Sequence, residues 1–211
     1  MSDRVLYIYG AGGHAKVVAA AARSCGYTIG GFWEDSTERV GMDFFGSRIV
    51  AFQEVPDGAF AFIAFGNNAI RLRRGRELIS RFSFPSIIHP SAQIATGVEI
   101  GRGCYFGALS NVDPGCKIGD FCIVNNNANI SHDTMLSAGC HICGGVNIAG
   151  NGRIGRCVLM GIGSCMMEEL SIGDDAVVGA GSTVIRDIPR ECVAVGCPAK
   201  IIKRSDDIEI K

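Results

Sequence analysis

The sequence predicts a small α/β domain over residues 1–87, a parallel β-helix over residues 88–189 and a capping tail over residues 190–211. The first observation behind this prediction is composition: 29 of 211 residues are glycine and only 8% are aromatic, which favours tight turns between short aliphatic strands. The second is a strict period of six in the middle of the chain. The third is the alternation of strand-like and helix-like segments before it.

Composition also narrows the functional classes. With 47% hydrophobic and 19% charged residues the chain is expected to be globular. Its net charge of −1 does not indicate the positively charged surface that would bind nucleic acid or an anionic membrane. The longest apolar runs fall far short of the ~20 residues of a membrane span. The first residues lead straight into a strand without a signal-peptide pattern. We therefore expect a soluble cytoplasmic protein whose ten cysteines are mostly free thiols.

The first 87 residues alternate between segments typical of strands and of helices. β-Branched and aromatic runs separated by turn residues indicate the strands, and an alanine-rich and an arginine-rich segment indicate the helices. This alternation predicts a small parallel sheet. The expected strands lie at 5–9, 28–33, 47–52 and 59–65, and the expected helices lie at 16–24 and before about residue 82.

A glycine-rich turn follows the first expected strand. Gly10, Gly12 and Ala15 fit the loop that holds a phosphate between a strand and a helix, and Glu34-Asp35 ends the next strand. The pattern occurs in NAD sites, but about 87 residues hold only one mononucleotide half of a doubly wound fold. We therefore expect a Rossmann-like domain that binds a nucleotide diphosphate, its pyrophosphate on the helix amides. Alternatively, the glycines only let the helix pack closely on the sheet.

The arginine-rich helix carries four arginines, at positions 71, 73, 74 and 76. We expect most of them on a solvated helix face. Arg71 is the expected exception, because it is nearest to Gly66-Asn67-Asn68 at the end of the last strand.

The period of six begins at Ile88. Seventeen positions at this spacing, ending at Val184, are all apolar, and small side chains dominate four places after each aliphatic. A large and a small inward residue on each short strand, with a turn every sixth residue, is the pattern of a hexapeptide β-helix. At three hexads per coil, seventeen hexads make between five and six coils. Each coil buries its aliphatics only against the coils above and below it.

Four cysteines fall in the small inward column, where a free thiol acts as a small apolar side chain. The pair Cys140 and Cys143 has the spacing of a metal or redox motif, but its members fall in columns that face different ways. We therefore expect structural thiols and no metal site. The four inward cysteines are Cys104, Cys116, Cys122 and Cys140.

His132 points outward from the repeat and precedes Asp133. One full coil is 18 residues, so Gly150 is expected directly above His132, one strand spacing away. An imidazole can take a proton from a nucleophile, and an unobstructed backbone N–H can stabilise an oxyanion, so the pair suits acyl transfer. The alternative is a solvated surface histidine.

With these motifs the chain resembles the acetyl-CoA-dependent acyltransferases of nucleotide-linked amino sugars, a family that includes sialic-acid O-acetyltransferases. The resemblance spans essentially the whole chain. It rests on the hexapeptide run, the segment 7–14, Gly66-Asn67-Asn68, Ser131-His132-Asp133, His141, Ala149-Gly150-Asn151 and the tail segment 195–200. Cys197 departs from the family, which has Asn in this tail turn.

The resemblance implies a left-handed β-helix, a homotrimer with active sites between subunits, acetyl-CoA as co-substrate and no metal. It also implies that the N-terminal domain holds the UDP, GDP or dTDP of a 4-amino-4,6-dideoxy sugar. His132 would be the general base, Asp133 would orient it, and Gly150 would donate to the thioester carbonyl. The cofactor would contact His141, Gly150, Gly161, Ile162, Ala180 and Lys200. The nucleotide sugar would contact Gly10, Gly12, Gly13, His14, Glu34, Asp35, Gly66, Asn67, Asn68 and Arg71.

The expected reaction is acetyl transfer to the 4-amino group of the sugar. A first alternative keeps the donor but transfers to a hydroxyl, as in acetylation of sialic acid or serine. A β-helix carbonic anhydrase would need three zinc-binding histidines, whereas the repeat supplies only His132 and His141 apart from the distant His89. A non-catalytic module that binds a nucleotide sugar is a further alternative.

Overall fold

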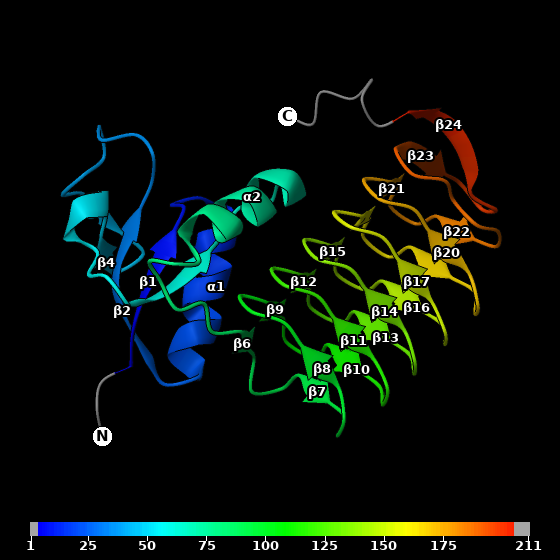
Figure 1. Cartoon of the computed structure of the whole chain (residues 1–211), viewed down its shortest axis with the longest axis horizontal. Helices are drawn as coiled ribbons and strands as arrows, with labels where there is room; N and C mark the ends of the chain where they lie inside the picture. Colours follow the sequence, from blue (N-terminus) through cyan, green and yellow to red (C-terminus); the bar gives the residue numbers. More distant parts are fainter. Residues whose placement is uncertain (1–3, 205–211) are drawn as a thin grey trace.

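The computed structural model describes residues 4–204 as a small α/β domain joined to a β-solenoid (Figure 1). The domain contains a three-stranded parallel sheet in the order β2–β1–β5, with two helices. This confirms the predicted fold class. The elements of the domain are β1 (Arg4–Tyr9), α1 (Gly13–Ser24), β2 (Tyr27–Trp33), β3 (Asp43–Phe44), β4 (Ser47–Arg48), η1 (Phe52–Glu54), β5 (Phe60–Ile63) and α2 (Asn68–Leu78).

The strand expected at 47–52 is largely absent. Ser47 and Arg48 form a hairpin with β3, and Ile49 then makes only an isolated parallel bridge to Phe32 of β2. The reason lies in the turn between them, where Phe45 and Gly46 both take positive φ angles and fold the chain back on itself. The segment then continues into the 3₁₀ helix η1.

The solenoid has three faces, each a parallel sheet whose neighbouring strands are one coil apart. The first face contains β6 (Ile87–Ile88), β9 (Tyr105–Phe106), β12 (Ile123–Val124), β15 (His141–Ile142), β18 (Leu159–Met160) and β21 (Val177–Val178). The second contains β7 (Gln93–Ile94), β10 (Asn111–Val112), β13 (Asn129–Ile130), β16 (Asn147–Ile148), β19 (Cys165–Met166) and β22 (Thr183–Val184). The third contains β8 (Glu99–Ile100), β11 (Lys117–Ile118), β14 (Met135–Leu136), β17 (Arg153–Ile154) and β20 (Ser171–Ile172).

Two strands extend the first face beyond the last coil. β23 (Cys192–Val195) pairs with β21, and β24 (Lys200–Arg204) pairs antiparallel with β23. They cover the open end of the solenoid, as such ends require. Residues 205–211 of the expected capping tail lie outside the described residues.

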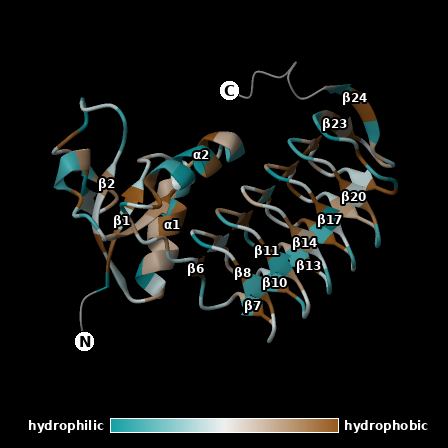
Figure 2. Cartoon of the chain, viewed as in Figure 1, coloured by the Kyte–Doolittle hydropathy of each residue, from teal (hydrophilic) through white to brown (hydrophobic). Residues whose placement is uncertain are grey.

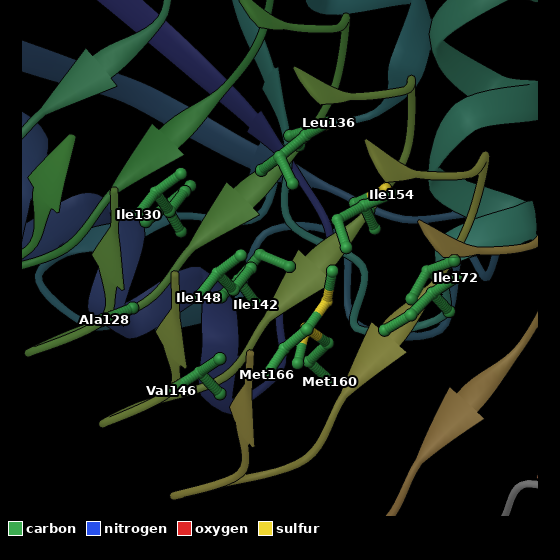
Figure 3. Close-up of a cluster of buried hydrophobic side chains, with 14 of the residues drawn as sticks. Ala128, Ile130, Leu136, Ile142, Val146, Ile148, Ile154, Met160, Met166 and Ile172 are labelled. Carbon is green, nitrogen blue, oxygen red and sulfur yellow. The ribbon is translucent and has the colours of Figure 1, made fainter. Parts of the chain in front are cut away.

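Tight turns at the three ridges make the coils possible. Every sixth residue from Gly97 to Gly181 has a positive φ, including non-glycine residues such as Asp133 at 59°. The aliphatics between these turns fill the interior, where Ile130 stacks on Ile148 and Leu136 stacks on Ile154 of the next coil (Figure 3). The four cysteines of the inward column are fully buried among them, as predicted.

The α/β domain packs on the first face and on the ridge that joins it to the third face, here called the Phe121 ridge (Phe121, Gly139 and Cys157). Helix α1 is mostly apolar, whereas hydrophilic residues dominate much of α2 (Figure 2). A β-carbon on Gly75 of α2 would stand 2.5 Å from the Phe121 ring, so this close approach requires glycine. Within residues 4–204 no helix has the length and apolarity that crossing a bilayer would demand.

Candidate active site in two halves

A pocket of about 800 Å³ lies at the carboxyl ends of the parallel strands β1, β2 and β5. Ligands of open α/β sheets bind at this edge, because the loops there leave a crevice that opens toward helix N-termini. The structure brings together eight of the residues expected to contact the nucleotide sugar: Gly10, Gly12, Gly13, His14, Glu34, Asp35, Gly66 and Asn67.

The glycine-rich turn is open toward this pocket. Gly10 has a φ of +113° and its N–H donates to the Trp33 carbonyl at 2.7 Å, which joins the turn to β2. A β-carbon on Gly12 or Gly13 would touch nothing within 4 Å. No side chain caps the N-terminus of α1 at Gly12. The first amides of α1 can therefore accept an anionic ligand such as a phosphate.

Three arginines that sequence reasoning did not assign to the site also line the pocket: Arg39, Arg73 and Arg74. Arg74 forms an ion pair with Asp35 at 2.9 Å, and Arg39 forms one with Glu34 at 3.2 Å. The solvated face expected for the arginine-rich helix is thus the pocket wall. Helical phase did not single out these positions, because Arg74 lies three residues after the buried Arg71 on a neighbouring part of the helix surface.

Tyr9 holds the carboxylate of Asp35 in place at one end of the pocket. Its hydroxyl donates a hydrogen bond to Asp35. Burial of the ring, together with this bond and the Asp35 charge, raises the pKa of Tyr9 well above its ordinary value. The phenol therefore stays protonated and holds one carboxylate oxygen, while Arg74 holds the other.

Two of the expected nucleotide contacts lie elsewhere, which corrects the sequence interpretation. The Arg71 side chain is fully buried and donates to carbonyls of the solenoid, so it does not reach the pocket. The side-chain amide of Asn68 donates to the carbonyls of Cys157 and Val158 at 3.0 and 3.1 Å. Proximity in sequence to Asn67 was misleading, because the helix turns successive side chains to different sides.

The second half of the site is the His132 ridge, which we define as the turns joining the second face to the third (His132, Asp133 and Gly150). His132 Nδ1 lies 2.9 Å from the Asp133 carboxylate, and both side chains are about 60% exposed, at 60% and 59%. A β-carbon on Gly150 would stand 2.6 Å from His132 Nε2. The imidazole therefore lies directly against the Gly150 backbone, as the 18-residue spacing predicts.

The backbone amide of Gly150 also lacks the hydrogen bond that some equivalent amides of the coil make. At three equivalent turn positions the amide donates to a side-chain oxygen eighteen residues later: Arg102 to Asp120, Ala108 to Asn126 and Arg156 to Asp174. Gly150 has Glu168 at that place, and no hydrogen bond joins the two among the residues the structure describes. The Gly150 N–H is therefore available to an external acceptor beside the imidazole.

His141 lies in β15 of the first face, away from the His132 ridge and close to His14 of α1. The two ring centroids are 6.5 Å apart, and the Nε2 atom of each ring is buried without a hydrogen-bond partner. Burial, followed by the Arg71 charge, lowers the pKa of His14 to about 4 and that of His141 to about 3. Both imidazoles are therefore neutral near pH 7 and retain unused hydrogen-bonding capacity.

The remaining expected cofactor contacts form a separate group. Gly161 and Ala180 stack on the ridge between the first and second faces, where a β-carbon on Gly161 would meet the Ala180 amide at 2.5 Å. Ile162 is exposed on the same ridge, and Lys200 is exposed in β24. One chain therefore does not bring these residues to His132. Within residues 4–204 no cluster of three or more His, Cys, Asp or Glu is arranged to hold a metal ion.

The two halves lie on opposite sides of the solenoid. The nucleotide pocket belongs to the domain that packs on the first face through contacts such as His14 on Tyr105. His132 lies between β13 of the second face and β14 of the third. In a three-sided prism the edge between the second and third faces is opposite the first face (Figure 1). Within one chain the pocket and His132 therefore lie on different sides of the solenoid.

Comparisons with known proteins agree on both parts. The PglD N-terminal domain family matches residues 5–78. A mutant of perosamine N-acetyltransferase from Caulobacter crescentus, solved in complex with CoA and GDP-perosamine, is 33% identical with a TM-score of 0.87, covering 93% of this chain and 96% of that chain. The acetyltransferase domain of PglB from Neisseria gonorrhoeae, in complex with acetyl coenzyme A, is 33% identical with a TM-score of 0.86, covering 95% and 100%.

Curated relatives match through a shorter region. Serine acetyltransferase from Synechococcus elongatus is 30% identical over 129 residues, which are 57% of this chain and 49% of the relative. Serine acetyltransferase 3 of Arabidopsis thaliana is 32% identical over 125 residues. This chain spans between 28% and 55% of the length of the first three such relatives.

Proposed function

Because this chain belongs to the hexapeptide-repeat acyltransferase family, we propose that it transfers the acetyl group of acetyl-CoA to the 4-amino group of a nucleotide-linked 4-amino-4,6-dideoxy sugar. The observation that carries the proposal is the contact of the His132 ring with the Gly150 backbone, next to Asp133. This arrangement supplies a base and an oxyanion donor at adjacent points. The nucleotide pocket and the likeness to enzymes solved with CoA and GDP-perosamine or acetyl-CoA support the substrate class.

His132 acts as the general base. Its Nδ1–H donates to Asp133, which leaves the Nε2 lone pair free to take a proton. The neutral sugar amine attacks the thioester carbonyl carbon, and Nε2 removes an amine proton as the C–N bond forms. The Gly150 N–H stabilises the resulting oxyanion. When the intermediate collapses, the C–S bond breaks and the CoA thiolate takes the proton from His132.

The α/β domain holds the nucleotide. The N-terminus of α1 and the side chains of Arg39, Arg73 and Arg74 would bind the diphosphate, because they combine amide donors with positive charge. Glu34 and Asp35 would accept from the ribose or base. Neutral His14 and His141 would contact the cofactor or substrate through their unpaired Nε2 atoms.

The enzyme works as a homotrimer with active sites between subunits. The opposite placement of the two half-sites supports this assembly, since His132 of one chain can meet the nucleotide pocket of a neighbour. Solvent-exposed apolar side chains on the solenoid, such as Leu109 and Ile162 at 65% and 68% exposure, also favour contact with a second copy. The free state of all ten cysteines fits a reducing, cytoplasmic location.

The test is release of free CoA thiol from acetyl-CoA in the presence of UDP-, GDP- and dTDP-linked 4-amino sugars. One nucleotide sugar should be consumed with stoichiometric thiol release, and the product should carry an N-acetyl group. The serine acetyltransferase relatives favour acetylation of a hydroxyl as the second candidate, so sialic acid and serine form separate arms. Turnover of sialic acid or serine without turnover of any amino sugar would overturn the proposed acceptor.

A further inference from the structure

Arg71 is the only charged side chain among the fully buried residues of the described chain. Its guanidinium uses every group it can donate. Nε donates to the Phe121 carbonyl at 2.8 Å, and the two terminal nitrogens donate to further carbonyls and to the Asn68 side chain. No carboxylate is among these partners. A buried cation without a counter-charge is costly, so carbonyl dipoles must hold it in place.

The hydrogen-bond partners of Arg71 come from two parts of the protein, the loop that lines the nucleotide pocket and the solenoid strand that carries His141. On the pocket side, Nη1 donates to the carbonyls of Phe65 and Gly66 at 2.9 and 3.4 Å, in the loop that lines the nucleotide pocket. On the solenoid side, Nη2 donates to the carbonyls of Gly139 and Cys140 at 2.8 and 3.2 Å. These two residues come immediately before His141.

We propose that Arg71 is a positioning residue, whose single guanidinium holds the nucleotide loop at Phe65–Gly66 in register with the strand that carries His141. This inference rests on the proposed function, in which the nucleotide sugar binds the Phe65–Gly66 loop and His141 contacts the cofactor or substrate. Lysine cannot replace the arrangement, since one ammonium group offers three donors from a single point, whereas the guanidinium is a planar fork.

The charge of Arg71 has a second consequence. The titratable groups near it are His14 on α1, His141 on β15 and the thiols of four cysteines, Cys104, Cys122, Cys140 and Cys157. After burial, the Arg71 charge is the next cause that lowers the pKa of both histidines. The same side chain therefore fixes the loop and helps to keep the two imidazoles neutral.

Two substitutions separate these roles. Arg71→Lys keeps the charge but loses the fork, and Arg71→Gln loses both. Arg76→Gln removes a charge from the exposed side of α2, and Leu72→Ala loosens the same helix–solenoid contact without changing charge. For each variant we would measure the affinity for UDP, GDP and dTDP by calorimetry, and the titration of the four histidines by NMR.

Both Arg71 variants should bind the preferred nucleotide about tenfold or more weakly, because bonds to the Phe65–Gly66 loop are lost. Only Arg71→Gln should raise the pKa values of His14 and His141, because it removes the charge that, after burial, lowers them. Arg76→Gln and Leu72→Ala should change neither quantity. Unchanged nucleotide affinity in folded Arg71→Lys would overturn the proposal, and this result stands even if Arg71→Gln does not fold.

These measurements need no acetyl transfer, so they are independent of the acceptor. If wild-type protein binds none of the nucleotides, the proposed function fails. The histidine titrations of Arg71→Gln and Leu72→Ala then still decide whether Arg71 acts on the strand of His141. Equal titrations in these two variants would reduce Arg71 to an ordinary packing residue and overturn the inference.

Discussion

The imidazole of His132 lies against the backbone of Gly150, one coil further along the solenoid. A β-carbon at position 150 would stand 2.6 Å from both Cε1 and Nε2 of the ring. This relationship leaves no room for a side chain between the imidazole and the amide. Glycine at position 150 is therefore a requirement of the geometry rather than of backbone conformation, because Gly150 is not among the positive-φ glycines.

Gly150→Ala should consequently inactivate the enzyme while leaving its fold intact. The methyl group would displace the His132 ring and cover the approach to the amide, so kcat should fall by about 10² or more, the size expected for loss of an oxyanion donor or a base. Steady-state kinetics would measure this fall, and thermal unfolding should show little change in Tm. Wild-type kcat in Gly150→Ala would remove both residues from the mechanism.

Gly115→Ala should weaken the reaction through Asp133. A β-carbon at Gly115 would collide with Asp133 Oδ1, so the carboxylate would move away from His132 Nδ1. We expect kcat to fall with little change in KM, because orientation of the base matters most in the transition state.

Gly97→Ala is the matched control for this change. Gly97 occupies the same turn position on the same ridge and has a similar positive φ, +85° against +78°, but a β-carbon there would touch nothing within 4 Å. Both variants should lose similar stability from backbone strain. If kcat falls equally in the two variants, strain rather than the Asp133 contact explains the loss.

The period of six made one half of the site predictable. Because three hexads close a coil without interruption, a residue and its neighbour 18 positions later must stack, and the relation of His132 to Gly150 follows by counting. The same counting predicted that the four cysteines of the inward column are buried, as the structure shows. Such counting works because a solenoid repeats one local structure and each coil contacts only its neighbours.

The α/β domain was less predictable because its contacts are not periodic. The buried side of α2 consists of Arg71, Leu72 and Gly75, so its apolar pattern is too weak to show which face packs. The Arg71 guanidinium donates to the carbonyls of Phe121 and Gly139, which are 50 and 68 residues away in the sequence. No local sequence pattern indicates partners this distant in the sequence. For that reason the sequence predicts that Arg71 contacts the nucleotide sugar, whereas the structure gives it a structural position.

Stability should depend on pH through His14 and His141. Their folded-state pKa values, about 4 and about 3, lie below the ordinary value of ~6.5. Between these limits the unfolded chain binds protons that the folded chain does not, so the free energy of unfolding falls as pH drops below about 6.5. Tm measured from pH 7.5 to 4 should therefore decline, and less steeply in His141→Asn. An equal slope in His89→Asn and His141→Asn would contradict this origin.

The separation of the two half-sites predicts that defective subunits can complement each other. His132→Ala destroys one half, and Gly12→Trp should fill the other, because Gly12 faces open space with a φ of −108° that tolerates a side chain. Each variant alone should be inactive. In trimers assembled at random from equal amounts of both, an interface is intact only when its ridge comes from Gly12→Trp and its pocket comes from His132→Ala. Co-expression should then restore about a quarter of the wild-type activity per site.

The matched control co-expresses His132→Ala with Gly150→Ala, two defects in the same half-site. Every ridge in those trimers carries one defect or the other, so no activity should return whatever the arrangement of subunits. Recovery that is confined to the first combination can arise only if ridge and pocket belong to different chains. Absence of recovery in both combinations, with trimers verified by light scattering, would mean that one chain completes its own site, against the opposite placement of His132 and the Gly12 loop.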